Sequence, residues 1–155
     1  MGSINAEFQF VSYKIDLFQF SARQDLHYLG ITQGIDPSKI KVGLSFRPPL
    51  YSTSNALYFG GIEAKVTHPF NDESLFELTA GIEGIFQVVE KAQFETDVEQ
   101  DLVRFQIPAI LFPYLRSAIT GFFANAGLGS FMFPLINVRE MAQQVGNHLE
   151  IKVIE

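Results

Sequence analysis

Apolar and polar residues alternate along much of the first half of the chain, which is the pattern of half-buried β-strands. The alternation is cleanest in residues 39–47, where apolar side chains are separated by Lys, Gly and Ser. Pro48 and Pro49 end the pattern, because proline cannot donate a hydrogen bond to a neighbouring strand. The apolar side of this strand consists of Ile40, Val42, Leu44 and Phe46.

Two other strand patterns change phase part of the way along. In residues 7–20 the apolar side shifts after Val11, and in residues 56–67 it shifts across the glycine pair at 60–61. A slip of one position moves the apolar side chains of a strand to its other face. Each change of phase therefore predicts a β-bulge.

A fourth strand pattern covers residues 74–89 and places Glu77 and Glu83 opposite its apolar side chains. Short turns separate the later strands, whereas residues 23–38 carry turn signals and are expected to form a long connection. Four such strands in sequence favour an antiparallel sheet that is apolar on one side.

Helix signals begin at Thr96, which Glu99 follows at the spacing of a capping box. Pro108 is expected to interrupt or restart this helix, because its ring removes a hydrogen-bond donor. Gly127 and Gly129 should end the second helical segment. The face of that segment expected to be buried consists of Leu111, Leu115, Ile119 and Phe122.

The end of the chain predicts one more short helix. Asn137 is a suitable N-cap, and Glu140 follows it at the third position. The helix is expected over residues 138–145, with Gly146 as its stop signal. The tail after about residue 147 is either a weak strand or disordered.

Composition restricts the partners of this chain. Seventeen acidic residues against eleven Lys and Arg give a formal net charge of −6. Without a basic cluster, neither nucleic acid nor an anionic membrane surface is expected as a partner. The longest apolar run, residues 107–112, is far short of a membrane span, and no signal-peptide pattern opens the chain. The absence of cysteine excludes disulfides and fits a cytoplasmic location.

Residues that could carry chemistry are few and scattered. The three histidines are far apart, in predicted loops or the tail, and no pair has metal-ligand spacing. Glu63, Glu77 and Glu83 could do acid–base work, but a solvated sheet face explains them more simply. The glycine pairs lack the order of a phosphate-binding loop. The sequence therefore supports neither an enzyme nor a metal or cofactor site.

Apolar side chains gather around a glycine-bearing loop near the C-terminus. The chain as a whole has sixteen Phe and no Trp. Such side chains can belong to the core, or they can form flexible surface that repacks around different apolar partners. The positions of interest are Phe131, Phe133, Val138, Met141 and Val145.

Three segments together resemble SecB, the cytosolic export chaperone. They are ILFPYLRSAITGFF at residues 110–123, FPLINV at residues 133–138 and GIF at residues 84–86, in an order that covers about residues 8–144. The resemblance implies an α+β fold, a single domain in which a four-stranded antiparallel sheet carries helices on one face. It also implies a tetramer, built as a dimer of dimers.

The same resemblance implies a function. SecB-type proteins are holdase chaperones that bind unfolded polypeptides without ATP, in long apolar grooves lined by the second strand and the last helix. Apolar burial at about 25 cal/mol per Å2 makes such a groove effective without sequence specificity. The corresponding positions are Ile40, Val42, Leu44, Val138 and Met141, and the expected groove extends to Phe46, Phe131, Phe133 and Val145.

The acidic sheet face of the SecB family docks the translocation motor SecA. Asp16 fits one of its positions and Glu77 is a loose candidate for another, but the residue four positions after Asp16 is Phe20 rather than glutamate. Two alternatives to an export chaperone therefore stay open. One is a SecB-like chaperone for other clients, such as the antitoxin of a toxin–antitoxin pair. The other is a protein that binds a small apolar ligand in a closed pocket.

Overall fold

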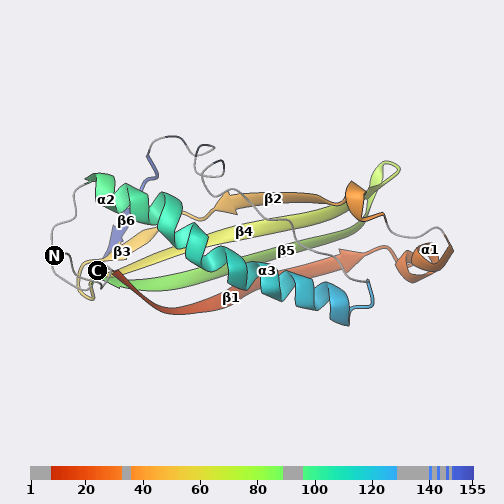
Figure 1. The fold of residues 1–155 in the computed structure, drawn as a ribbon, viewed down its shortest axis with the longest axis horizontal. Coiled ribbons are helices and arrows are strands. Elements are labelled where there is room, and N and C mark those ends of the chain that lie inside the picture. Colours follow the sequence, from red (N-terminus) through yellow and green to blue (C-terminus); the bar gives the residue numbers. More distant parts are fainter. Residues whose placement is uncertain are drawn as a thin grey trace, which may run out of the picture.

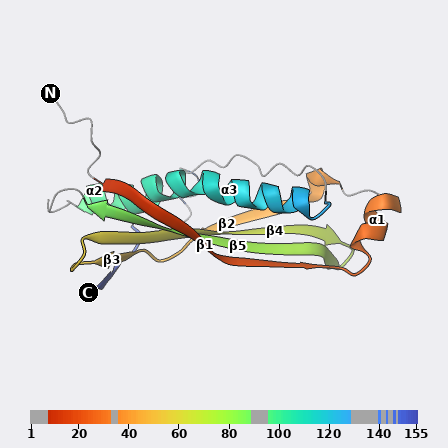
Figure 2. The ribbon, with the colours of Figure 1, turned by 90° about the horizontal axis from the view of Figure 1, so that it is seen from below.

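A long helix packed across one face of a β-sheet forms the body of the protein, as Figure 1 and Figure 2 show. The computed structural model describes residues 8–32, 36–88, 96–128, 140, 143, 146 and 148–155. The elements in chain order are β1 (Phe8–Ala22), α1 (Leu26–Thr32), the 3-10 helix η1 (Pro37–Lys39), β2 (Lys41–Phe46), β3 (Leu50–Ser52), β4 (Leu57–Phe70), β5 (Glu73–Val88), α2 (Thr96–Asp101), the π-helix η2 (Leu102–Gln106), α3 (Ile107–Asn125) and β6 (Lys152–Ile154).

Within the described part of the chain the sheet has six strands, five of them in the order β1-β5-β4-β3-β6, and β2 also pairs with β4. The strands β1, β2, β4 and β5 form the antiparallel sheet that the sequence predicts. The strands β3 and β6 are additions to that prediction, and they pair with each other in parallel. Each has only three residues, too few for an alternating pattern to be recognised.

One continuous helix runs from Asp97 to Asn125 through α2, η2 and α3. The α-helical pattern is interrupted just before Pro108 and restarts in α3, as predicted, although the chain stays helical throughout. The chain passes through a π-helical turn there, in which the amide of Ile107 donates to the carbonyl oxygen of Leu102, and Pro108 then lies in the first turn of α3. By length and composition this helix could cross a membrane, as the core helices of many soluble proteins could.

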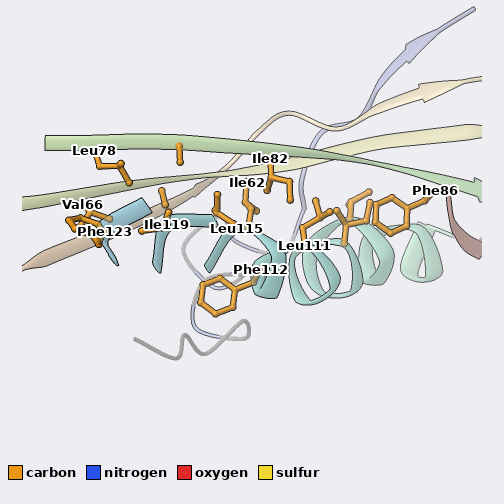
Figure 3. Packing of buried hydrophobic residues seen from close by; sticks show 14 of the residues in the cluster. Ile62, Val66, Leu78, Ile82, Phe86, Leu111, Phe112, Leu115, Ile119 and Phe123 are labelled. Carbon is orange, nitrogen blue, oxygen red and sulfur yellow. The ribbon is translucent and has the colours of Figure 1, made fainter. Parts of the chain in front are cut away.

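The helix α3 packs on β4 and β5, and the buried core lies between them. Leu111, Leu115 and Ile119 are fully buried, as predicted, but the next buried residue is Phe123 rather than Phe122. Figure 3 shows this helix beside the core side chains of the sheet, among them Ile62, Val66, Leu78 and Ile82. The side of the sheet that α3 covers is called the helix face, and the opposite side is called the outer face.

The bulge predicted in β1 is present, because the register with β5 shifts between Phe10 and Ser12. A second shift, between Ile15 and Leu17, was not predicted. It lies at Asp16, whose side chain forms an ion pair on the outer face. The sequence carried a signal for this second shift, because the apolar phase passes from Ile15 to Phe18 and Phe20 across it.

The bulge predicted at the glycine pair of β4 is wrong, because the ladder with β5 passes through both glycines without a shift. At this point side chains pack closely against both faces of the sheet. A Cβ on Gly60 would lie 2.9 Å from Cδ1 of Ile107, and a Cβ on Gly61 would lie 2.9 Å from Cδ of Arg47. The apparent change of phase arose because apolar Phe59 lies on the outer face.

The stretch expected to be a long connection, residues 23–38, contains α1 and η1. Leu26 and Leu29 lie one helical turn apart and are both buried in the core. Arg23 precedes the helix and forms an ion pair with Glu73 at 2.9 Å. The spacing of the two leucines was the signal that could have indicated this helix.

The end of α3 agrees with the sequence. Gly127 has a φ of +77°, the left-handed conformation that glycine adopts most easily at a helix end. Gly129, the other predicted stop signal, lies outside the described residues.

Most of the helix predicted over residues 138–145 lies outside the described residues, as does its N-cap Asn137. Glu140 and Gln143 are helical, and Gly146 has a φ of +78°. The tail, for which the sequence predicted either a weak strand or disorder, contains β6.

Candidate functional site

The apolar side chains of β2 lie on the helix face, at the edge of the sheet. They are only half-buried, because α3 packs on β4 and β5, further into the sheet. Their partners on β4, Val66, Ala64 and Ile62, are fully buried. The half-buried strip is called the β2 apolar row and consists of Ile40, Val42, Leu44 and Phe46.

The β2 apolar row also lies next to open backbone. Among the described residues, β2 pairs with β4 alone. The amide of Arg47 donates to the carbonyl oxygen of Gly61 at 2.9 Å, so these two residues are a hydrogen-bonded pair. Along an antiparallel ladder such pairs alternate with pairs whose backbone groups point outward. The backbone groups of Val42, Leu44 and Phe46 therefore point away from β4. The same three residues thus offer both apolar side chains and backbone groups that no described residue pairs.

The five positions expected to form the second wall of the groove lie outside the described residues. These positions are Phe131, Phe133, Val138, Met141 and Val145.

The outer face carries an ion-pair network around Arg47. Its Nη1 donates to Oδ2 of Asp16 at 2.6 Å, and its Nε donates to Oε1 of Glu63 at 3.0 Å. The side chain is 19% exposed and lies over Gly61 and Gly81, where a Cβ would collide with it. The hydrogen bond from Arg47 holds the pKa of Asp16 below its ordinary value, and the same bond raises the pKa of Arg47.

Asp16 is therefore not a free acidic group on the outer face. Glu77 also lies on that face, opposite Ser21 of β1, and accepts a hydrogen bond of 3.4 Å from the Ser74 hydroxyl. Leu17, next to Asp16, pairs with Gly81, four residues along β5 from Glu77. At about 3.3 Å per residue the two acids are roughly 13 Å apart along the strand. The structure places them on one face but does not bring them together.

The outer face is balanced in charge rather than acidic. Over the paired lengths of the four antiparallel strands its cations are Lys14, Lys41, Arg47 and Lys65, and its anions are Asp16, Glu63, Glu77 and Glu83. The ion pairs of Arg47 with Asp16 and Glu63 were not predicted from the sequence. Glycines in the polar phase of two neighbouring strands were the available signal.

Tyr58 and Glu99 hold α2 against the sheet. The Tyr58 hydroxyl donates to the Glu99 carboxylate at 2.5 Å. Burial, and after it the nearby carboxylate, raises the pKa of Tyr58, so its hydroxyl remains a neutral donor. Glu99, which was predicted to cap the helix, thus contacts the sheet. The side chain of Thr96, its predicted capping partner, lies outside the described part of the chain.

The C-terminal segment, residues 148–155, lies against both α2 and β3. Gln100 is 5% exposed, and its side-chain amide binds the backbone of Leu149 in both directions, at 2.9 and 2.7 Å. Arg104 donates to the carbonyl oxygen of Gly146 at 2.7 Å. The contact between Gln100 and Leu149 was not predicted from the sequence.

His68, placed in a loop by the sequence analysis, lies near the end of β4 and is buried. Its Nδ1 hydrogen-bonds to the carbonyl oxygen of Pro69 at 2.9 Å. Within the described ranges there is no group of three His, Asp or Glu side chains that could hold a metal ion.

Residues 37–148 match the SecB family, described as preprotein translocase subunit SecB. No curated protein sequence matches the chain. A SecB-like chaperone of Mycobacterium tuberculosis, solved in complex with a ChAD peptide from the HigA1 antitoxin, has a TM-score of 0.61 at 12% identity, with 84% of this chain and 91% of that chain covered. A protein of unknown function from Streptococcus agalactiae has a TM-score of 0.43 at 12% identity, with 84% and 98% covered.

Proposed function

The chain belongs to the SecB family, as its sequence motifs indicated, and from that premise we propose that it holds unfolded polypeptides without ATP. Proteins of this family are chaperones rather than enzymes. The observation that carries the proposal is the β2 apolar row, which is half-buried at the edge of the sheet beside backbone groups that have no partner among the described residues.

An unfolded polypeptide matches this strip chemically, because it exposes both apolar side chains and unpaired backbone groups. Apolar burial contributes about 25 cal/mol per Å2 irrespective of sequence, and backbone pairing is equally indifferent to side-chain identity. The second wall of the proposed groove consists of Phe131, Phe133, Val138, Met141 and Val145. A client held in this way needs no nucleotide.

The proposed assembly is a tetramer, a dimer of dimers. An exposed apolar patch formed by β1 and α3 supports it: Tyr13, Ile110 and Tyr114 are 44%, 36% and 40% exposed. The rings of Tyr13 and Tyr114 stack with their centroids 4.3 Å apart, so the two elements present one continuous surface. Contiguous exposed apolar area of this kind marks interfaces between proteins.

The clients are proposed to be cytoplasmic, either preproteins on the way to export or the antitoxin of a toxin–antitoxin pair. Docking to SecA through an acidic face has little support here, because Arg47 engages Asp16 and the outer face is balanced in charge. The antitoxin peptide bound by the Mycobacterium tuberculosis protein favours the second client class.

The test combines light scattering, for the mass of the assembly, with an aggregation assay on a chemically unfolded client. We expect a tetramer that suppresses aggregation of unrelated clients without ATP. A monomer that protects no client would refute the proposal. Saturable binding of one small apolar molecule per chain, without client protection, would favour the ligand-binding alternative.

A further inference from the structure

The C-terminal segment is held mainly through its main chain. Gln100 binds the amide and the carbonyl oxygen of Leu149. The amide of Lys152 donates to the carbonyl oxygen of Pro49 at 3.0 Å, and the amide of Thr53 donates to the carbonyl oxygen of Ile154 at 3.1 Å. These hydrogen bonds would form with any residue in an extended conformation.

The side chains of the segment add one simple requirement. Leu149 and Ile151, two positions apart, are half-buried against the core, whereas Val153 is 63% exposed and Lys152 is exposed. The site therefore accepts an extended segment with two alternate apolar residues. Unfolded polypeptides contain many such segments.

The segment is also weakly held. It contributes three residue pairs, in parallel, at the edge of the sheet, and parallel pairing is the less stable kind. Gln100 on the other hand is buried, and its amide group would lose both partners if nothing replaced Leu149. Leaving a buried polar group unpaired is costly, so exchange of one strand for another is favoured over an empty site.

We propose that Gln100 and the edge of β3 form a second polypeptide-binding site, separate from the β2 apolar row. The C-terminal segment fills this site in the free protein, and an extended client segment fills it in the complex. The inference rests on the proposed function. Because β2 and β3 both pair with β4 on the same side, one client chain can occupy the row and the site together.

A disulfide lock tests the exchange. Leu50 and Lys152 are direct partners in the parallel ladder, at a spacing of about 4.8 Å, which a disulfide can bridge. The chain has no cysteine of its own, so Leu50→Cys/Lys152→Cys can be compared with itself in oxidised and reduced form. The probe is reduced, carboxymethylated α-lactalbumin, which stays unfolded in either redox state.

We expect the oxidised double variant to bind this probe roughly tenfold or more weakly than the reduced one, because the tethered strand can no longer leave. The Leu50→Ser/Lys152→Ser variant, treated identically, should show no dependence on redox state. Equal affinity of the locked and reduced forms would overturn the proposal.

Amide hydrogen exchange provides a second readout on the unmodified protein. The amides of Leu149 and Lys152 are bonded in the free structure and should exchange slowly there. Saturation with the probe should release them and speed their exchange roughly tenfold or more. Unchanged protection in the complex would also overturn the proposal.

The two levels of inference fail differently. If the unmodified protein does not bind the probe at all, the holdase function itself fails. If it binds the probe while both amides stay protected and the lock has no effect, only the second binding site is refuted.

Discussion

Arg47 and Asp16 come from opposite edges of the antiparallel sheet, yet Nη1 of one lies 2.6 Å from Oδ2 of the other. The strands β4 and β5 lie between them, and neighbouring strands are about 4.8 Å apart. The arginine can cross both because Gly61 and Gly81 leave space beneath its side chain. The pair therefore joins β1 to the end of β2 across the outer face.

Replacing Gly81 with alanine should break this contact. The new Cβ would overlap the guanidinium of Arg47, and we expect the free energy of unfolding to fall by about 1–3 kcal/mol. Gly43→Ala is the matched control, because no atom of the described residues lies within 4 Å of a Cβ there and alanine should leave stability unchanged or raise it. Urea denaturation measures both variants, and equal effects would argue against the contact.

Asp16→Asn should destabilise the protein in a pH-dependent way. The folded-state pKa of Asp16 is held below its ordinary value of 3.8 by Arg47. The contribution of the carboxylate is therefore complete above that value and is lost as the pH falls through the folded-state pKa. We expect a deficit of about 1 kcal/mol near neutral pH that shrinks below pH 3.8. A deficit that does not change with pH would show that the charge of Asp16 is not what matters.

Leu44→Asp should weaken the binding of an unfolded client roughly tenfold or more, because it puts a charge into the β2 apolar row. Ser45→Asp is the control, since the neighbouring side chain of the same strand lies on the outer face. Adding Met141→Asp should abolish holding, with the mass by light scattering unchanged. Val42→Thr makes the β2 apolar row more polar but keeps the shape of the side chain, so weaker client binding by this variant is not explained by misfolding. If Leu44→Asp and Ser45→Asp bind the client with equal affinity, the β2 apolar row is not part of the client-binding groove.

Gln100→Ala should release the C-terminal segment. The buried amide makes two hydrogen bonds to Leu149, and their loss should lower the free energy of unfolding by about 1–3 kcal/mol and expose the Leu149 amide to hydrogen exchange. Gln106→Ala removes an exposed hydrogen bond to Asp101 and should cost less than about 0.5 kcal/mol. Slow exchange of Leu149 in Gln100→Ala would show that the segment is held by other contacts.

Alternation predicted β2 and β5 well because each strand buries one face more than the other. It could not predict β3, and it left the segment of β6 open between strand and disorder, because the pairing of these two strands joins residues far apart in the sequence. The buried face of α3 was predicted up to its last member. Steps of four from Leu111 through Ile119 lead to Phe123, and the helix follows that series rather than the one ending at Phe122.

The candidate site, too, could be predicted from the sequence only where local geometry determines it. The β2 apolar row could be inferred from one strand alone, because its members share a face through local geometry. The engagement of Asp16 by Arg47, 31 residues away, and of Leu149 by Gln100, 49 residues away, depends on tertiary structure. The second wall of the groove stays a prediction from the sequence.

The glycines under α3 have a consequence for how this protein can vary. A Cβ on Gly60 would lie 2.9 Å from Cδ1 of Ile107, and one on Gly84 would lie 2.7 Å from Cδ2 of Leu111, so two side chains of α3 rest directly on the main chain of the sheet. Substitutions that exchange one aliphatic residue for another elsewhere in the interior leave these contacts intact. Aliphatic residues elsewhere in the interior can therefore be exchanged during evolution, provided that positions 60 and 84 remain glycine.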